Sequence, residues 1–150
     1  MTDVLHVSSE ASDDYRLSLL NLINGFRQQA NLHLLELSTS LCVAAQTHAE
    51  DMARNNYFSH TCLNGSSAIN RAEKAGYPSS FVGENIASGN EHIEAVFEQW
   101  LNSSGHRENM LNEKYKEAGI GYVLQSPHTN DSHYWVLLLG HPNPQELIAS

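Results

Sequence analysis

The chain has 150 residues, of which 8 are Lys or Arg and 17 are Asp or Glu, so its formal net charge is −9. This length supports one well-buried domain and is short for two. The negative charge repels phosphate backbones, which argues against nucleic acid as a partner. Because no run of about 18 apolar residues occurs, we expect no transmembrane segment.

The first ten residues, MTDVLHVSSE, have neither the basic region nor the apolar stretch of a signal peptide. Two expectations about the compartment therefore stay open. The chain is either cytoplasmic as it stands or a mature fragment whose export signal has been removed. Residues 1–12 are polar without a period, and we predict a loose, flexible N-terminal arm there.

Two amphipathic helices are predicted in the first third of the chain. Apolar residues recur at steps of three and four from Tyr15 to Ala30, which is the period of a helix with one buried face. The Ser-Thr-Ser cluster at 38–40 supplies N-cap hydroxyls for a second helix that ends near Asn55. His48 lies in the apolar stripe of this helix, so we predict a core histidine with one satisfied hydrogen bond rather than a metal ligand.

The rest of the chain predicts both helices and strands. The segments with helical patterns are 67–75, 91–102 and 106–111. The strand-like segments are 81–87, 119–124 and 134–139, of which the last two favour an antiparallel hairpin across the turn-rich segment 126–132. We expect an α+β domain over 13–142, with a small antiparallel sheet covered by helices on both faces, and an irregular C-terminal tail over 143–150.

Cys42 and Cys62 are the two cysteines of the chain. The helix that starts near Cys42 carries the chain about 20 Å away before Cys62 is reached, whereas a disulfide requires Cα atoms within about 7 Å. We therefore favour two free thiols over a disulfide. Metal binding is disfavoured for both, because neither has a second cysteine at ligand spacing.

Three short polar motifs carry groups suited to chemistry: Tyr57–His60, Gly83–Ala87 and Gly105–Asn109. Histidine and carboxylate side chains hold divalent metals and transfer protons. Within the second motif, Glu84 stands on a buried strand, where an ionised carboxylate is costly unless it is paired or coordinated.

Two of the candidates in these motifs, Glu84 and His60, also have a purely structural interpretation. A salt bridge from Glu84 to Arg71 or Arg107 is the structural alternative to a functional carboxylate. His60 taken alone is a surface histidine beside a turn. His106 starts a helix, and the positive end of the helix dipole keeps its imidazole neutral and able to bind a metal.

Taken in order, the motifs of this chain resemble those of the CAP superfamily, which includes cysteine-rich secretory proteins, antigen-five proteins and plant pathogenesis-related proteins. The similarity covers about residues 15–140 and is greatest to the short bacterial branch. The matching segments are Tyr57–His60, Gly65–Ser66, Arg71–Tyr77, Gly83–Ala87, Trp100–Ser103, Gly105–Asn109, Gly119–Tyr122 and Tyr134–Trp135. This resemblance implies a three-layer α-β-α sandwich with a central cleft, in a protein that is extracellular or periplasmic.

The resemblance also implies a metal cleft built from two histidines and two glutamates. Carried over motif by motif, the expected ligands are His60, His106 and Glu84, and the expected cofactor is a divalent metal such as zinc. The second glutamate of the family falls on Ser103, which puts a mechanism that needs two carboxylates in doubt. The residues expected to line the cleft are Ser103, Asn85 and Asn109.

Two functions from different classes follow from the resemblance. The first is a non-enzymatic binding module for an apolar ligand, such as a sterol or fatty acid, or for a protein partner. The second is a metal-assisted hydrolase, a peptidase or esterase, in which Glu84 activates a metal-bound water. Because one carboxylate leaves no separate proton donor for a leaving group, the binding module is favoured.

Overall fold

A computed structural model describes the backbone of residues 2–124 and 133–149 and the side chains of 15–124 and 133–147. Its helices are α1 (Thr2–Gln29), α2 (Thr39–Asn55), α3 (Ala68–Lys74), α4 (Ile93–Leu101), α5 (Ser104–Leu111) and α6 (Gln145–Ala149). Its strands are β1 (Glu36–Leu37), β2 (Val82–Ser88), β3 (Glu117–Leu124) and β4 (His133–Gly140). Over these described residues, every helix is too short or too polar to cross a bilayer.

The four strands form one sheet in the order β1-β3-β4-β2. The predicted hairpin is confirmed, since β3 and β4 pair antiparallel; its connecting segment 126–132 lies outside the described residues. Strand β2 pairs antiparallel with the other side of β4. The expected all-antiparallel sheet needs one correction, because β1 joins β3 in parallel. Two residues are too few to carry an alternating pattern, so sequence gives no signal for β1.

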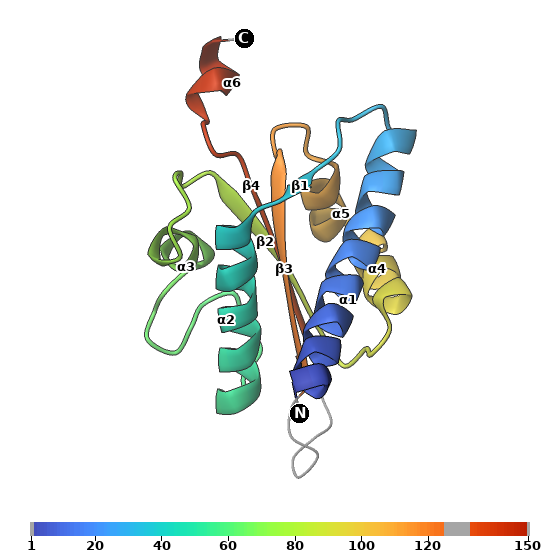
Figure 1. The fold of residues 1–150 in the computed structure, drawn as a ribbon. Helices are drawn as coiled ribbons and strands as arrows, with labels where there is room; N and C mark the ends of the chain where they lie inside the picture. Colours follow the sequence, from blue (N-terminus) through green and yellow to red (C-terminus); the bar gives the residue numbers. More distant parts are fainter. Residues whose placement is uncertain (1, 125–132, 150) are drawn as a thin grey trace.

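Helices cover both faces of the sheet, which confirms the three-layer α-β-α sandwich. In Figure 1, α2 and α3 lie on one side of the sheet and α1, α4 and α5 lie on the other. Strand β4 divides its side chains between two cores, as successive residues of a strand must. The side chains of Trp135, Leu137 and Leu139 pack toward α1, α4 and α5. The side chains of Tyr134, Val136 and Leu138 pack toward α2 and α3.

Glycines on β3 let the backbone of α2 touch the sheet. A Cβ atom placed on Gly119 would lie 2.1 Å from the carbonyl carbon of Leu41, and one on Gly121 would lie 2.5 Å from that of Ala45. Both distances are far below van der Waals contact, so no larger residue fits without a shift of α2. The two glycines therefore fix the position of α2 on this face.

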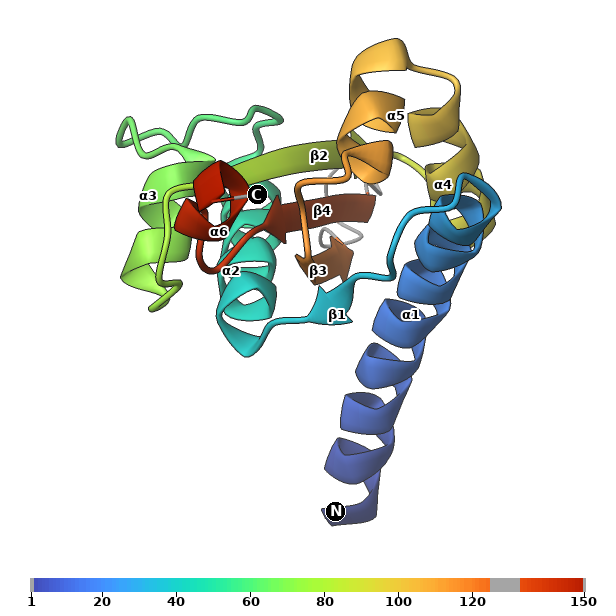
Figure 2. The same cartoon turned by 90° about the horizontal axis from the view of Figure 1, so that it is seen from above.

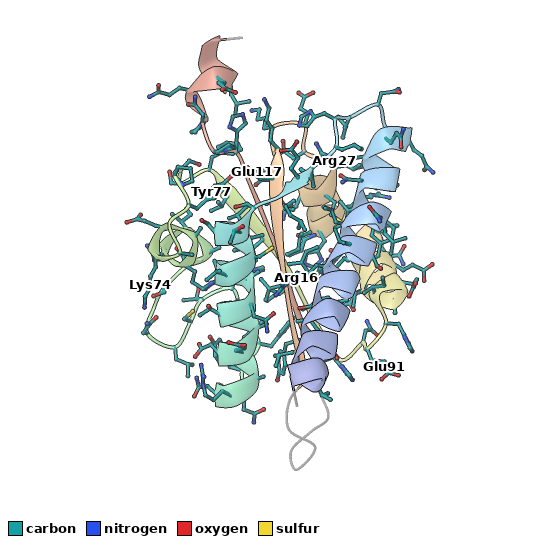
Figure 3. All side chains as sticks on the ribbon, viewed as in Figure 1. Arg16, Arg27, Lys74, Tyr77, Glu91 and Glu117 are labelled. Carbon is teal, nitrogen blue, oxygen red and sulfur yellow. The ribbon has the colours of Figure 1, made fainter. Side chains whose placement is uncertain are left out.

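Arg27 ties α1 to the segment that follows α5 (Figure 3). Its side chain is fully buried, and its Nη1 donates to the carbonyl oxygens of Met110 at 3.0 Å and Asn112 at 2.9 Å. Its Nε donates to the carbonyl oxygen of His33 at 2.9 Å. A buried cation satisfied by carbonyl oxygens holds the C-terminal end of α5 in place.

Both chain ends contain more helix than the sequence predicts. Helix α1 begins at Thr2, so residues 2–12 of the expected loose arm are helical, and this part of α1 projects beyond the sheet in Figure 2. No Gly or Pro interrupts residues 2–14, so nothing there breaks the helix. The tail predicted as irregular contains α6, which follows Pro144, a residue suited to the first turn of a helix.

Candidate functional site

The three predicted site residues come from three different elements around β2, the edge strand of the sheet. Glu84 lies on β2, His106 lies on α5, and His60 lies in the loop that follows α2. Both α3 and α5 pack against β2, and Figure 2 shows them near opposite ends of this strand. An edge strand leaves one side open, so side chains from both helical layers can meet there.

Glu84 forms a buried ion pair with Arg71 of α3. The Arg71 Nη2 atom lies 2.6 Å from Glu84 Oε2, and the two side chains are only 7% and 3% exposed. The Nη1 atom of Arg71 also donates to the carbonyl oxygen of His60 at 3.0 Å. The salt bridge considered from sequence is therefore present, and its partner is Arg71 rather than the exposed Arg107.

The second oxygen of Glu84 binds His60. Glu84 Oε1 lies 2.7 Å from His60 Nδ1, whereas the His60 side chain as a whole remains 57% exposed. Since an ionised carboxylate only accepts hydrogen bonds, His60 donates through Nδ1, and the lone pair of its neutral form lies on Nε2. This hydrogen bond raises the pKa of His60 above its ordinary value, although partial burial and the charge of Arg71 act in the opposite direction.

His106, the third predicted residue, lies near enough to His60 for the two charges to interact. Burial, followed by the charge of nearby His60, lowers the pKa of His106. A lowered pKa favours the neutral imidazole expected from the sequence, but its causes are burial and His60 rather than the helix dipole. The Nδ1 atom of His106 is buried and has no hydrogen-bond partner among the described residues.

Two asparagines hold the His106 backbone against β2. Asn85 is fully buried, and its Nδ2 donates to the His106 carbonyl oxygen at 3.0 Å. Asn109 Nδ2 in turn donates to Asn85 Oδ1 at 2.9 Å. Sequence analysis missed this positioning role; the available signal was a polar amide next to Glu84 on a buried strand, which must find partners. Ser103 precedes α5 and is partly exposed, and its hydroxyl makes no capping hydrogen bond.

A family model matches residues 20–139 of the chain, and its description is "CAP: Cysteine-rich secretory protein family". The chain belongs to the CAP family. The Bacillus subtilis protein YkwD is 35% identical over 109 residues, which cover 73% of this chain and 42% of YkwD. An uncharacterized protein of Borreliella burgdorferi is 30% identical over 131 residues, covering 87% of this CAP chain and 81% of that protein.

Solved structures contain the same CAP fold. An extracellular protein with an SCP domain from Bacillus anthracis superposes with a TM-score of 0.74 at 30% identity, covering 83% of this chain and 39% of that one. An outer surface protein of Borrelia burgdorferi gives a TM-score of 0.75 at 26% identity, covering 85% and 92%. This CAP chain thus spans less than half of YkwD and of the B. anthracis protein.

Proposed function

We propose that this CAP domain is a secreted-type binding module whose cleft holds a divalent ion, such as zinc, between His60 and His106. The main support is that both oxygens of Glu84 are engaged, one by Arg71 and the other by His60. In this arrangement Glu84 orients an imidazole instead of binding the metal itself. Glu84 then supports the ligand His60 through a hydrogen bond, whereas the sequence led us to expect Glu84 itself as a ligand.

The donor set suits zinc on chemical grounds. Zinc accepts neutral imidazole nitrogens, and a histidine ligand commonly donates its other ring N–H to a carboxylate. His60 meets the second condition through Glu84, and the lowered pKa of His106 keeps its nitrogen available for coordination. A bound ion would supply positive charge with open positions for a polar group of a partner or ligand.

The same geometry disfavours the hydrolase. A general base must reach and deprotonate a water molecule, whereas the Glu84 side chain is only 3% exposed and is held in an ion pair by Arg71 and in a hydrogen bond by His60. Ser103 offers a hydroxyl where a second carboxylate would be needed, and an unshifted hydroxyl is a poor acid near neutrality. We therefore expect no hydrolysis of peptides or esters by the native domain, with or without zinc.

The occupant of the module is proposed to be an apolar molecule, such as a sterol or fatty acid, or a protein partner. A pocket of about 500 Å³, called here the α2–α3 pocket, offers space for an apolar group beside Val43 and Leu63. The names of two relatives, an extracellular protein and an outer surface protein, support a location outside the cytoplasm.

Calorimetric zinc titration tests the metal cleft. His60→Ala and His106→Ala should each abolish the binding step that depends on the two imidazoles. His92→Ala is the matched control, because His92 is 74% exposed and pairs only with Glu91 at 3.3 Å among the ion pairs of the described residues. Unchanged zinc binding in both cleft variants would refute the metal cleft. Zinc-dependent ester or peptide hydrolysis that both variants lose would instead make the domain an enzyme.

A further inference from the structure

A second group of side chains of the types that bind metals lies beside Arg71, apart from His60 and His106. The ligand atoms of His48, Asp51 and Cys62 all lie within 4.8 Å of one another. All three residues line the α2–α3 pocket. We propose that these three side chains form a second metal site, selective for a thiophilic divalent ion such as zinc.

His48 is already oriented to act as a ligand. Its side chain is 0% exposed, and its Nε2 lies 2.8 Å from the carbonyl oxygen of Ser59. A carbonyl oxygen only accepts, so Nε2 carries the proton and Nδ1 carries the lone pair. That lone pair faces Cys62, whose Sγ lies 3.6 Å from Nδ1.

Asp51 lies one helical turn after His48 on α2, so both side chains occupy the same face of the helix. Its Oδ2 accepts a hydrogen bond from the Tyr57 hydroxyl, and its Oδ1 accepts one from Asn55 Nδ2 at 2.7 Å. Such outer contacts fix the direction of a ligating carboxylate and leave lone pairs for a metal. The carboxylate is therefore held toward the pocket before any ion arrives.

The charges of the site match a dication. When the ion binds, the Cys62 thiol releases its proton to solvent, and the resulting thiolate and the Asp51 carboxylate together balance two positive charges. The nearby guanidinium of Arg71 donates to Cys62 Sγ at 3.1 Å, and its own charge is already balanced by Glu84. Thiolate, imidazole and carboxylate are all zinc ligands, and the thiolate disfavours magnesium and calcium.

The pocket leaves a coordination position open. With a volume of about 500 Å³, it can admit water or a small anionic ligand as the fourth group on the ion. The sequence disfavoured metal binding by Cys62 because no second cysteine stands nearby. The structure supplies two ligands from α2 instead, a pairing that cysteine spacing does not reveal.

Cobalt titration followed by absorption spectroscopy tests this site, since a thiolate ligand gives Co²⁺ an ultraviolet charge-transfer band and imidazole ligands alone do not. The native chain should show the band, and Cys62→Ser should abolish it. Cys42→Ser is the matched control, because Cys42 is also free and partly buried, and it should keep the band. Asp51→Asn should weaken cobalt binding at least tenfold while circular dichroism confirms the fold.

The outcomes separate this proposal from the cleft of His60 and His106. His60→Ala should keep the charge-transfer band even if it loses the imidazole site. A native chain without the band, a band retained by Cys62→Ser, or a band lost in Cys42→Ser would each overturn the second site.

Discussion

Arg71 is the residue on which both candidate sites depend. Its Nη2 pairs with Glu84, and its Nη1 donates to both Cys62 and the His60 backbone. A single buried guanidinium therefore links the proposed cleft to the α2–α3 pocket.

Removing this guanidinium should be costly. Arg71→Ala would leave Glu84 buried without its cation, and we expect a loss of about 3–5 kcal/mol in the free energy of unfolding. Arg54→Ala is the control, because Arg54 is 68% exposed and lies 3.8 Å from Asp51, a surface geometry worth at most about 1 kcal/mol. Urea unfolding measures both variants. Equal, small losses would mean that the ion pair does not hold the site together.

The pH dependence of zinc binding follows from His60. Protons compete with the metal for imidazole, so affinity must fall as the pH falls. Because its contact with Glu84 raises the pKa of His60, the loss should begin above the ordinary histidine value of about 6.5. Zinc affinities measured at a series of pH values test this. A flat profile, or a loss confined to pH values well below 6.5, would argue against His60 as a ligand.

The amino-acid sequence alone predicts only part of the chemistry of the candidate site. The motifs name His60, Glu84 and His106, and burial of a strand carboxylate correctly predicts that Glu84 needs a partner. Which arginine pairs with it depends on how α3 packs against β2, and no spacing in the sequence encodes that. The same limit applies to Cys62, which packing brings beside His48 of α2 and Arg71 of α3.

At the scale of elements, local patterns predicted most helices and strands. Ser38 caps α2 by accepting from the Leu41 N–H at 3.2 Å, and Ser67 forms a capping box with Asn70 at the start of α3. The starts of these two helices can be predicted from the sequence because capping is a local interaction. Strand β1 could not be predicted because its two residues carry no alternating pattern and pair with the distant strand β3.

The contact of α2 with β3 gives a prediction at this scale. Gly119→Ala would drive its Cβ into the α2 backbone at Leu41, so we expect destabilisation of about 1–3 kcal/mol or more. Gly25→Ala is the control, because a Cβ atom on Gly25 meets nothing within 4 Å. Because Gly25 lies in the interior of α1, its replacement by alanine should raise the free energy of unfolding by about 0.5–1 kcal/mol. Thermal unfolding compares the two, and a neutral Gly119→Ala would contradict the close packing of α2.

At the scale of the whole molecule, the sandwich brings its two helical layers together around β2. Arg71 approaches this strand from the layer of α2 and α3, while His106 approaches it from the layer of α1, α4 and α5. The alternation along β4 supplies a separate core for each layer, so each layer is packed independently on its own face of the sheet. The proposed site therefore depends on how both layers pack against β2, and His60, with its side chain 57% exposed, is its solvent-facing member.

Anomalous X-ray diffraction at the zinc absorption edge, from crystals grown with zinc, distinguishes a zinc ion held by the two histidines from one held by Glu84. We expect a zinc peak bonded to imidazole nitrogens of both His60 and His106, with Glu84 still paired to Arg71. Zinc bonded to the Glu84 carboxylate with Arg71 displaced, or no zinc between the two histidines, would contradict it.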